Sequence, residues 1–130
     1  MAEANYPDDL RYHDQHDWVR LEGDDHAVFG VTWYAQDSLG EVVFYDPPEV
    51  GASVQKDSSY AEVESVKAVS DVIAPMSGEI VEVNDVLEDA PEKINEDPYG
   101  EGWLIKVKLT SSDEYGALLG AAEYRKLLEN

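Results

Sequence analysis

Lys67 is the residue of this chain best placed to carry chemistry, because it is a single amine between two expected strands. It is the centre of the segment Glu64-Ser65-Val66-Lys67-Ala68-Val69-Ser70-Asp71. Between Arg20 and Lys93, the only lysine or arginine besides Lys67 is Lys56. Small or β-branched residues flank Lys67, which is typical of a lysine at a hairpin tip. An enzyme that must acylate one lysine needs such a residue, so the sequence indicates a carrier whose chemistry belongs to an attached cofactor.

Short strands broken by glycine and proline turns predict the scaffold that positions this lysine. The expected strands are residues 16–21, 27–31, 41–45, 59–66, 69–73, 79–83 and 103–109. A helix is expected over 33–39, where Gly40 ends it, and a helical turn begins near Asn84. The pattern predicts a mainly β (α+β) fold, a sandwich or flattened barrel with short helices and a C-terminal helical segment.

The last part of the chain contains two further signals. Ser111 and Glu114 have the spacing of a helix capping box, and Gly120 is expected to interrupt the terminal helical segment that follows. The aromatic residues Trp18, Trp103, Tyr99 and Phe44 are predicted to anchor the core or the loops.

Length and charge limit the class of protein. The chain has 130 residues, enough for one domain, which we place at 11–130 behind a flexible acidic segment at 1–10. The first residues lack the basic and apolar regions of a signal peptide, and no apolar run approaches the ~18 residues of a membrane span, so a cytoplasmic location is expected. The formal net charge is −20, from 9 cationic and 29 acidic residues. Such a chain is not expected to bind nucleic acid, and the charge favours a monomer that approaches basic patches on partners.

Cysteine and histidine usage argues against a redox or metal site made by the chain itself. There are no cysteines, which excludes a disulfide, a thiol nucleophile and a thiolate metal site. His13 and His16 lack a recognisable ligand set, so no metal is expected and His16 is interpreted as structural. Any sulfur chemistry would therefore come from an attached group.

A series of motifs resembles a known family. The motifs are Tyr12-x-x-x-His16-x-Trp18, Gly30-Val31-Thr32-x-Tyr34-Ala35-Gln36, Leu39-Gly40-Glu41-Val42-Val43-Phe44, the Lys67 segment, Ala74-Pro75-x-Ser77-Gly78-Glu79, Val83-Asn84 and Asn95-Glu96-Asp97-Pro98-Tyr99-Gly100-x-Gly102-Trp103. Together they resemble the H-protein family of the glycine cleavage system over residues 10–128. The resemblance implies a hybrid fold of the biotinyl/lipoyl type, with lipoic acid in amide linkage to Lys67. Lysine and lipoyl group together would make an arm of roughly 14 Å, at roughly 1.25 Å per single bond.

The resemblance also implies roles for four other residues. Glu64 and Gly78 match positions that help the attaching enzyme recognise the hairpin, although Gly78 is equally well explained as a turn glycine. Asp17 and Asp71 match the carboxylates that hold the amine of the loaded arm, against the simpler interpretation of solvated acids. Asp17 is shorter than the glutamate usual in the family. Biotin is the rival cofactor on such a fold, but methionines normally flank a biotinyl lysine.

The partners implied are those of a non-catalytic carrier subunit. A lipoate-protein ligase or lipoyl/octanoyl transferase would attach the group. Glycine decarboxylase, aminomethyltransferase and dihydrolipoamide dehydrogenase would then use it. Two departures from the family, Trp33 in place of aspartate and the segment 44–48, leave alternatives open. The chain could carry sulfur for a heterodisulfide-reductase-like complex, or it could be a lipoyl donor or an inactive relative.

Overall fold

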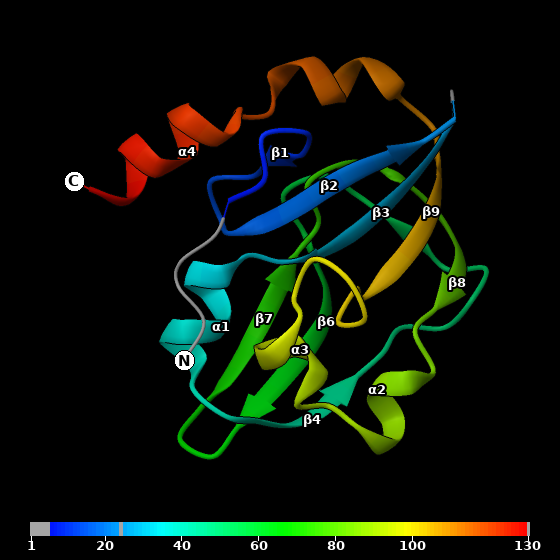
Figure 1. The fold of residues 1–130 in the computed structure, drawn as a ribbon. Helices are drawn as coiled ribbons and strands as arrows, with labels where there is room; N and C mark the ends of the chain where they lie inside the picture. Colours follow the sequence, from blue (N-terminus) through cyan, green and yellow to red (C-terminus); the bar gives the residue numbers. More distant parts are fainter. Residues whose placement is uncertain (1–5, 24, 130) are drawn as a thin grey trace.

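The computed structural model describes residues 6–23 and 25–129 and contains two antiparallel sheets with short helices at their edges (Figure 1). The larger sheet has the strand order β1-β2-β3-β9-β8-β5, and the smaller sheet has the order β4-β6-β7. The strands of the larger sheet are β1 Arg11–Tyr12, β2 Asp17–Glu22, β3 His26–Val31, β9 Ile105–Leu109, β8 Gly78–Val83 and β5 Ser53–Val54. Those of the smaller sheet are β4 Val42–Asp46, β6 Ser59–Ser65 and β7 Val69–Ile73. The helices are α1 Trp33–Leu39, α2 Val86–Asp89, α3 Lys93–Glu96, the 3₁₀ helix η1 Ser112–Ala117 and α4 Ala121–Leu128. This arrangement confirms the mainly β fold predicted from the sequence.

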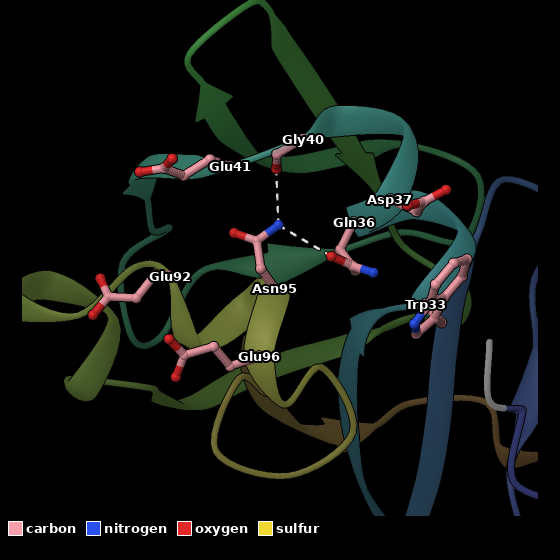
Figure 2. Close-up of a pocket in the computed structure, with 8 residues that line it drawn as sticks. All are labelled: Trp33, Gln36, Asp37, Gly40, Glu41, Glu92, Asn95 and Glu96. Atoms are coloured by element: carbon pink, nitrogen blue, oxygen red, sulfur yellow. Dashed lines mark hydrogen bonds between the residues drawn. The ribbon is translucent and has the colours of Figure 1, made fainter. Parts of the chain in front are cut away.

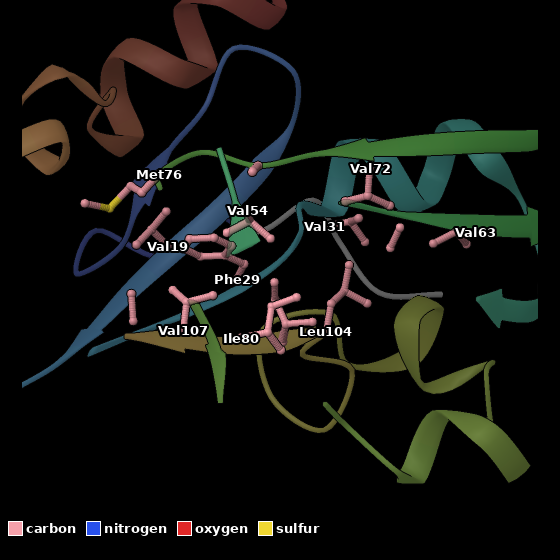
Figure 3. Close-up of a cluster of buried hydrophobic side chains, with 14 of the residues drawn as sticks. Val19, Phe29, Val31, Val54, Val63, Val72, Met76, Ile80, Leu104 and Val107 are labelled. Carbon is pink, nitrogen blue, oxygen red and sulfur yellow. The ribbon is translucent and has the colours of Figure 1, made fainter. Parts of the chain in front are cut away.

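An apolar core fills the space between the two sheets (Figure 3). Phe29 on β3, Val107 on β9 and Val63 on β6 are each fully buried in it. Strand alternation produces this arrangement, because every second residue of a strand points to the same face. Each fully buried side chain of this size contributes about 1.5–3 kcal/mol relative to exposure, so the core is a main source of stability.

A second core lies on the other face of the larger sheet, under α4. Its buried members are Tyr6, Leu10, Tyr12, Trp18, Val28, Ala121 and Tyr124. Tyr6 and Leu10 belong to the N-terminal segment 1–10 that the sequence predicted to be flexible. From Tyr6 onward the described part of that segment is packed, because these two side chains close the apolar surface beneath α4. Residues 1–5 lie outside the described residues.

Three local predictions were wrong. The capping box does not form, since the Glu114 carboxylate accepts hydrogen bonds from the Ser77 amide at 2.7 Å and the Ser77 hydroxyl at 3.1 Å. The motif at 95–102 was expected to be a loop, but its first two residues, Asn95 and Glu96, form the end of helix α3. Phe44 is 53% exposed and not an anchor, because the register shifts between Val42 and Phe44 and interrupts the alternation of β4.

The C-terminal segment follows its prediction more closely. Gly120 separates η1 from α4 and is the N-terminal cap of α4. Among the described residues, no helix has the length and apolar character needed to cross a membrane.

Candidate functional site: a lysine hairpin beside an acidic-floored cleft

The hairpin between β6 and β7 presents Lys67 on a turn fixed by one serine. The Ser65 hydroxyl oxygen accepts hydrogen bonds from the amides of Lys67 at 3.3 Å and Ala68 at 3.1 Å. The Ser65 amide donates to the Ala68 carbonyl at 2.8 Å, and the Val66 amide donates to the Glu41 carbonyl at 3.0 Å. Residues 66–68 are exposed, whereas Ser65 is buried. A buried hydroxyl therefore holds a solvent-exposed turn, and Lys67 is its tip.

The stem of Lys67 lies against the C-terminal end of α1. A Cβ atom at Gly40 would lie 3.3 Å from Lys67 Cε, so the absence of a side chain at Gly40 makes room for the stem. Gly40 also has a φ of +82°, a left-handed value that favours glycine, and its amide caps α1 by donating to the Gln36 carbonyl at 3.0 Å.

Asn95 fixes that end of α1, a role that sequence reasoning missed. Its Nδ2 donates to the Gly40 carbonyl at 2.8 Å and to Gln36 Oε1 at 3.1 Å, as Figure 2 shows. Its Oδ1 accepts a hydrogen bond from the Val42 amide at 2.8 Å. One amide thus joins α3, the end of α1 and the start of β4. These hydrogen bonds join residues more than fifty positions apart, so no local sequence pattern predicts them.

A surface depression of about 540 Å³ lies on one side of α1 (Figure 2). Its lining includes four carboxylates and one indole. The lining residues are Trp33, Gln36, Asp37, Gly40, Glu41, Glu92, Asn95 and Glu96. Trp33, the residue that departs from the family pattern, lies here and does not line the cleft on the other side of α1.

That second cleft, the arm cleft, has a volume of about 350 Å³ and begins at the hairpin. It is lined by Gln15, His16, Asp17, Val31, Tyr34, Ala35, Ser38, Leu39, Val63, Ala68, Val69, Ser70, Asp71 and Val72. Ala68, next to Lys67, is part of its wall, and the two predicted carboxylates Asp17 and Asp71 both contribute to it. Apolar side chains, with the Asp17 carboxylate among them and Asp71 at the exposed edge strand, suit an aliphatic arm that ends in a cation.

The two carboxylates have different environments. Asp71 is exposed on the edge strand β7, whereas Asp17 is only 1% exposed. The Tyr60 hydroxyl donates a hydrogen bond to Asp17 Oδ2 at 2.8 Å. Burial raises the pKa of Asp17 well above its usual value, and the Tyr60 hydrogen bond opposes part of that rise. Asp17 is therefore not a solvated acid.

His16 forms the edge of the arm cleft in a structural role. Its φ of +80° is unusual for a non-glycine residue, and its Nδ1 lies 2.7 Å from the Tyr124 hydroxyl. Its ring is 4.6 Å from the ring of Tyr34. Burial lowers the pKa of His16, which favours the neutral imidazole. Among the described residues, no group of three or more His, Cys, Asp or Glu side chains is arranged to hold a metal ion.

Glu64 and Gly78 do not line the arm cleft. Glu64 is exposed on the outer face of β6, three residues before Lys67. Gly78 is buried in the larger sheet, where it pairs with Val54 and Leu109. A Cβ atom there would lie 2.5 Å from the Lys108 carbonyl oxygen, which gives Gly78 a packing role of its own. Recognition of either residue by an attaching enzyme stays a prediction.

A two-sheet β domain with an exposed lysine on a fixed hairpin has the arrangement expected of a biotinyl/lipoyl-type carrier domain. The model of the family described as Glycine cleavage H-protein matches residues 10–130. The chain therefore belongs to the glycine cleavage H-protein family, whose members are lipoyl carrier subunits that hold lipoic acid on a lysine and are not catalysts themselves.

Individual relatives agree with this assignment over almost the whole chain. A glycine cleavage system H protein from Symbiobacterium thermophilum is 51% identical over 121 residues, which is 93% of this chain and 94% of the relative. Another, from Rubrobacter xylanophilus, is 52% identical over 126 residues, 97% of each chain. The crystal structure of a glycine cleavage system H protein from Mycobacterium marinum has a TM-score of 0.87 and 43% identity, covering 95% of this chain and 99% of that one.

We predict that Gly78→Ala destabilises the fold, because the added methyl group would collide with the backbone of β9. Overpacking of this kind costs about 1–3 kcal/mol, so the urea midpoint should fall. Gly116→Ala is the matched control, since a Cβ atom there meets nothing within 4 Å. An unchanged midpoint with slower lipoylation would instead show that Gly78 serves recognition alone.

We also predict that Asp17→Asn stabilises the unmodified protein at pH 7. The folded pKa of Asp17 is above the unfolded value, so its contribution is most favourable at acid pH and is lost as pH rises through the folded pKa. Asparagine keeps an oxygen for the Tyr60 hydroxyl and never ionises. Thermal unfolding at pH 4 and pH 7 should show a larger gain in Tm at pH 7. A gain that is the same at both values would contradict the prediction.

Proposed function

We propose that this chain carries an aminomethyl group on lipoyl-Lys67 in the glycine cleavage system, and that it works in the cytoplasm. The observation that supports this most directly is the exposed lysine on a fixed turn at the mouth of the arm cleft. The lipoyl group, when bound, supplies the dithiolane sulfur that a cysteine-free chain lacks. The residues of this chain fit that group, since the cleft offers apolar walls for the arm and carboxylates for its amine.

The proposed roles of individual residues follow from their positions. Lys67 anchors the arm, Ser65 holds the turn that presents it, and Asp17 with Asp71 receives the amine of the loaded arm. Docking in the cleft holds the arm on the protein between enzymes. The covalent attachment to Lys67 then gives the load a high local concentration at each partner, so the load does not have to diffuse through solution.

The proposed partners include glycine decarboxylase, aminomethyltransferase, dihydrolipoamide dehydrogenase and a lipoate-attaching enzyme. The outer face of the smaller sheet is suited to them because it adjoins the hairpin and is acidic. Cross-strand pairing places Asp46, Glu62 and Asp71 side by side, and all three are exposed. Like charges directly opposite each other destabilise a sheet, so this row is more favourable when a cationic surface covers it.

Two observations favour glycine cleavage over the sulfur-carrier alternative. The relatives with about half of their residues identical bear the glycine cleavage name. Trp33, whose departure from the family pattern motivated the alternative, lies outside the arm cleft.

We predict that Lys67→Arg abolishes both lipoylation and carrier activity, because a guanidinium remains protonated and is not acylated. Mass spectrometry should show no lipoyl adduct, and glycine–bicarbonate exchange with a glycine decarboxylase should fall to background. The fold should survive, since Lys67 is exposed. Lys56→Arg is the matched control and should keep both properties. Confirmed lipoylation without exchange in the unsubstituted protein, beside an active control H protein, would shift the assignment to the sulfur carrier.

We further predict that Glu62→Lys weakens the encounter with the decarboxylase without destabilising the carrier. The substitution replaces the middle carboxylate of the row and relieves its repulsion. The KM for lipoylated protein should rise several-fold at low salt, and its dependence on salt should become shallower. Glu129→Lys makes the same charge change at the end of α4 and should leave KM near that of the unsubstituted protein. Equal effects of both variants would show that net charge matters and the row does not.

A further inference from the structure

Tyr60 and Asp17 form a hydrogen-bonded pair in the floor of the arm cleft. We propose that Tyr60 positions Asp17 so that the cleft selects an arm ending in a protonated primary amine. This inference rests on the proposed function, because it concerns the load that the lipoyl arm carries. Tyr60 acts here through Asp17 and is a positioning residue, whereas Asp17 is the group that would meet the amine.

A bulge in β6 is what turns the Tyr60 side chain inward. The pairing with β7 shifts register between Ser59 and Ala61, which leaves Tyr60 as the extra residue. In a regular strand Tyr60 would point away from the face that holds buried Ala61. The ring of Tyr60 instead packs against the core between the sheets, 6.2 Å from the ring of Phe29. Bulges commonly redirect one side chain next to a functional site, and this bulge directs a hydroxyl to Asp17.

The two oxygens of Asp17 are used differently. Oδ2 accepts the hydrogen bond from Tyr60 at 2.8 Å. Among the described residues, none donates a hydrogen bond to Oδ1. Asp17 is only 1% exposed, but it is one of the residues that line the arm cleft, so Oδ1 is the oxygen left for a ligand that enters there. One oxygen is fixed, and the other is available to a ligand.

An ammonium group would supply what this carboxylate lacks. Within the described part of the chain, Asp17 has no lysine, arginine or histidine within 4 Å in an ion pair. His16, its neighbour in the chain, favours the neutral form because burial lowers its pKa. A buried carboxylate without a counter-charge is unfavourable, and a charge-assisted hydrogen bond to an incoming ammonium would offset this.

The same arrangement would reject other loads. A neutral hydroxyl would leave the charge of Asp17 uncompensated. An anionic sulfur group would meet the carboxylate of Asp17, and like charges at short range repel. The inference therefore deepens the proposed function by assigning Tyr60, through Asp17, a part in selecting the aminomethyl load over arms that end in a neutral or anionic group.

The absence of cysteine allows a direct test. After reduction, the lipoyl thiols are the only thiols in the protein. Alkylation with 2-bromoethylamine or 2-bromoethanol forms a carbon–sulfur bond and releases bromide, which gives arms of similar size ending in ammonium or hydroxyl. NMR shifts of the amides of Val31, Val63 and Val69 would report the fraction of each arm that is docked in the cleft.

We expect the unsubstituted protein to dock the ammonium arm on the order of tenfold more favourably than the hydroxyl arm, the ratio that a charge-assisted hydrogen bond supports. Tyr60→Phe should lower docking of the ammonium arm by a similar factor and leave the hydroxyl arm unchanged. Tyr45→Phe is the matched control. It removes a buried hydroxyl that donates to the Leu104 carbonyl and not to Asp17, so both arms should dock as before.

Several outcomes would overturn the inference. Equal docking of the two arms in the unsubstituted protein would show that the cleft does not select a cation. Equal loss of both arms in Tyr60→Phe would show that Tyr60 only packs. Asp17→Asn tests the same pair independently of Tyr60 and should abolish the preference, so a preference that persists would also contradict it. Failure of a lipoate ligase to modify Lys67 would appear by mass before any docking experiment and would overturn the proposed function itself.

Discussion

The side-chain amide of Asn95 is the interaction on which the geometry of the site depends. It satisfies a carbonyl at the end of α1, a side chain within α1 and an amide at the start of β4. Buried polar groups need such partners, and here one residue provides three. These hydrogen bonds fix Gly40 relative to β4, and the stem of Lys67 lies against Gly40. The position of the lysine thus depends on a contact made by α3, an element that supplies no residue to the arm cleft.

Stability and function are distributed over different parts of the molecule. Two apolar cores, one between the sheets and one under α4, provide the burial that folding requires. Asp17 lies beside the first core and reduces stability when it is ionised, because burial disfavours the charged carboxylate. Tyr60 lessens that cost but does not remove it. A site that binds a charged group often retains such an unfavourable residue, since optimising it for the empty protein would remove the affinity.

Sequence patterns predicted the parts of this protein that depend on local order. The alternation around Lys67, the glycine at the end of α1 and the spacing of turns gave the hairpin and the mainly β fold. The resemblance to the family gave Asp17 and Asp71, which the arm cleft brings together. The bulge at Tyr60 could not be predicted, because a strand pattern assigns alternate faces and this residue breaks the alternation. The role of Glu114 was missed because its spacing to Ser111 suits a helix cap. Its carboxylate instead binds the backbone amide of Ser77, which is distant in the sequence.

The acidic row on the smaller sheet has a consequence for how the carrier behaves at high concentration. Both outer strands of this sheet, β4 and β7, have an edge that no described strand covers. Open edges and flat faces invite pairing with a second copy, and proteins commonly prevent it with charge. Stacking two copies through this face would place two rows of carboxylates against each other. The charges proposed to attract a basic partner would therefore also oppose the binding of one carrier to the same face of another, which would leave that face available for brief encounters.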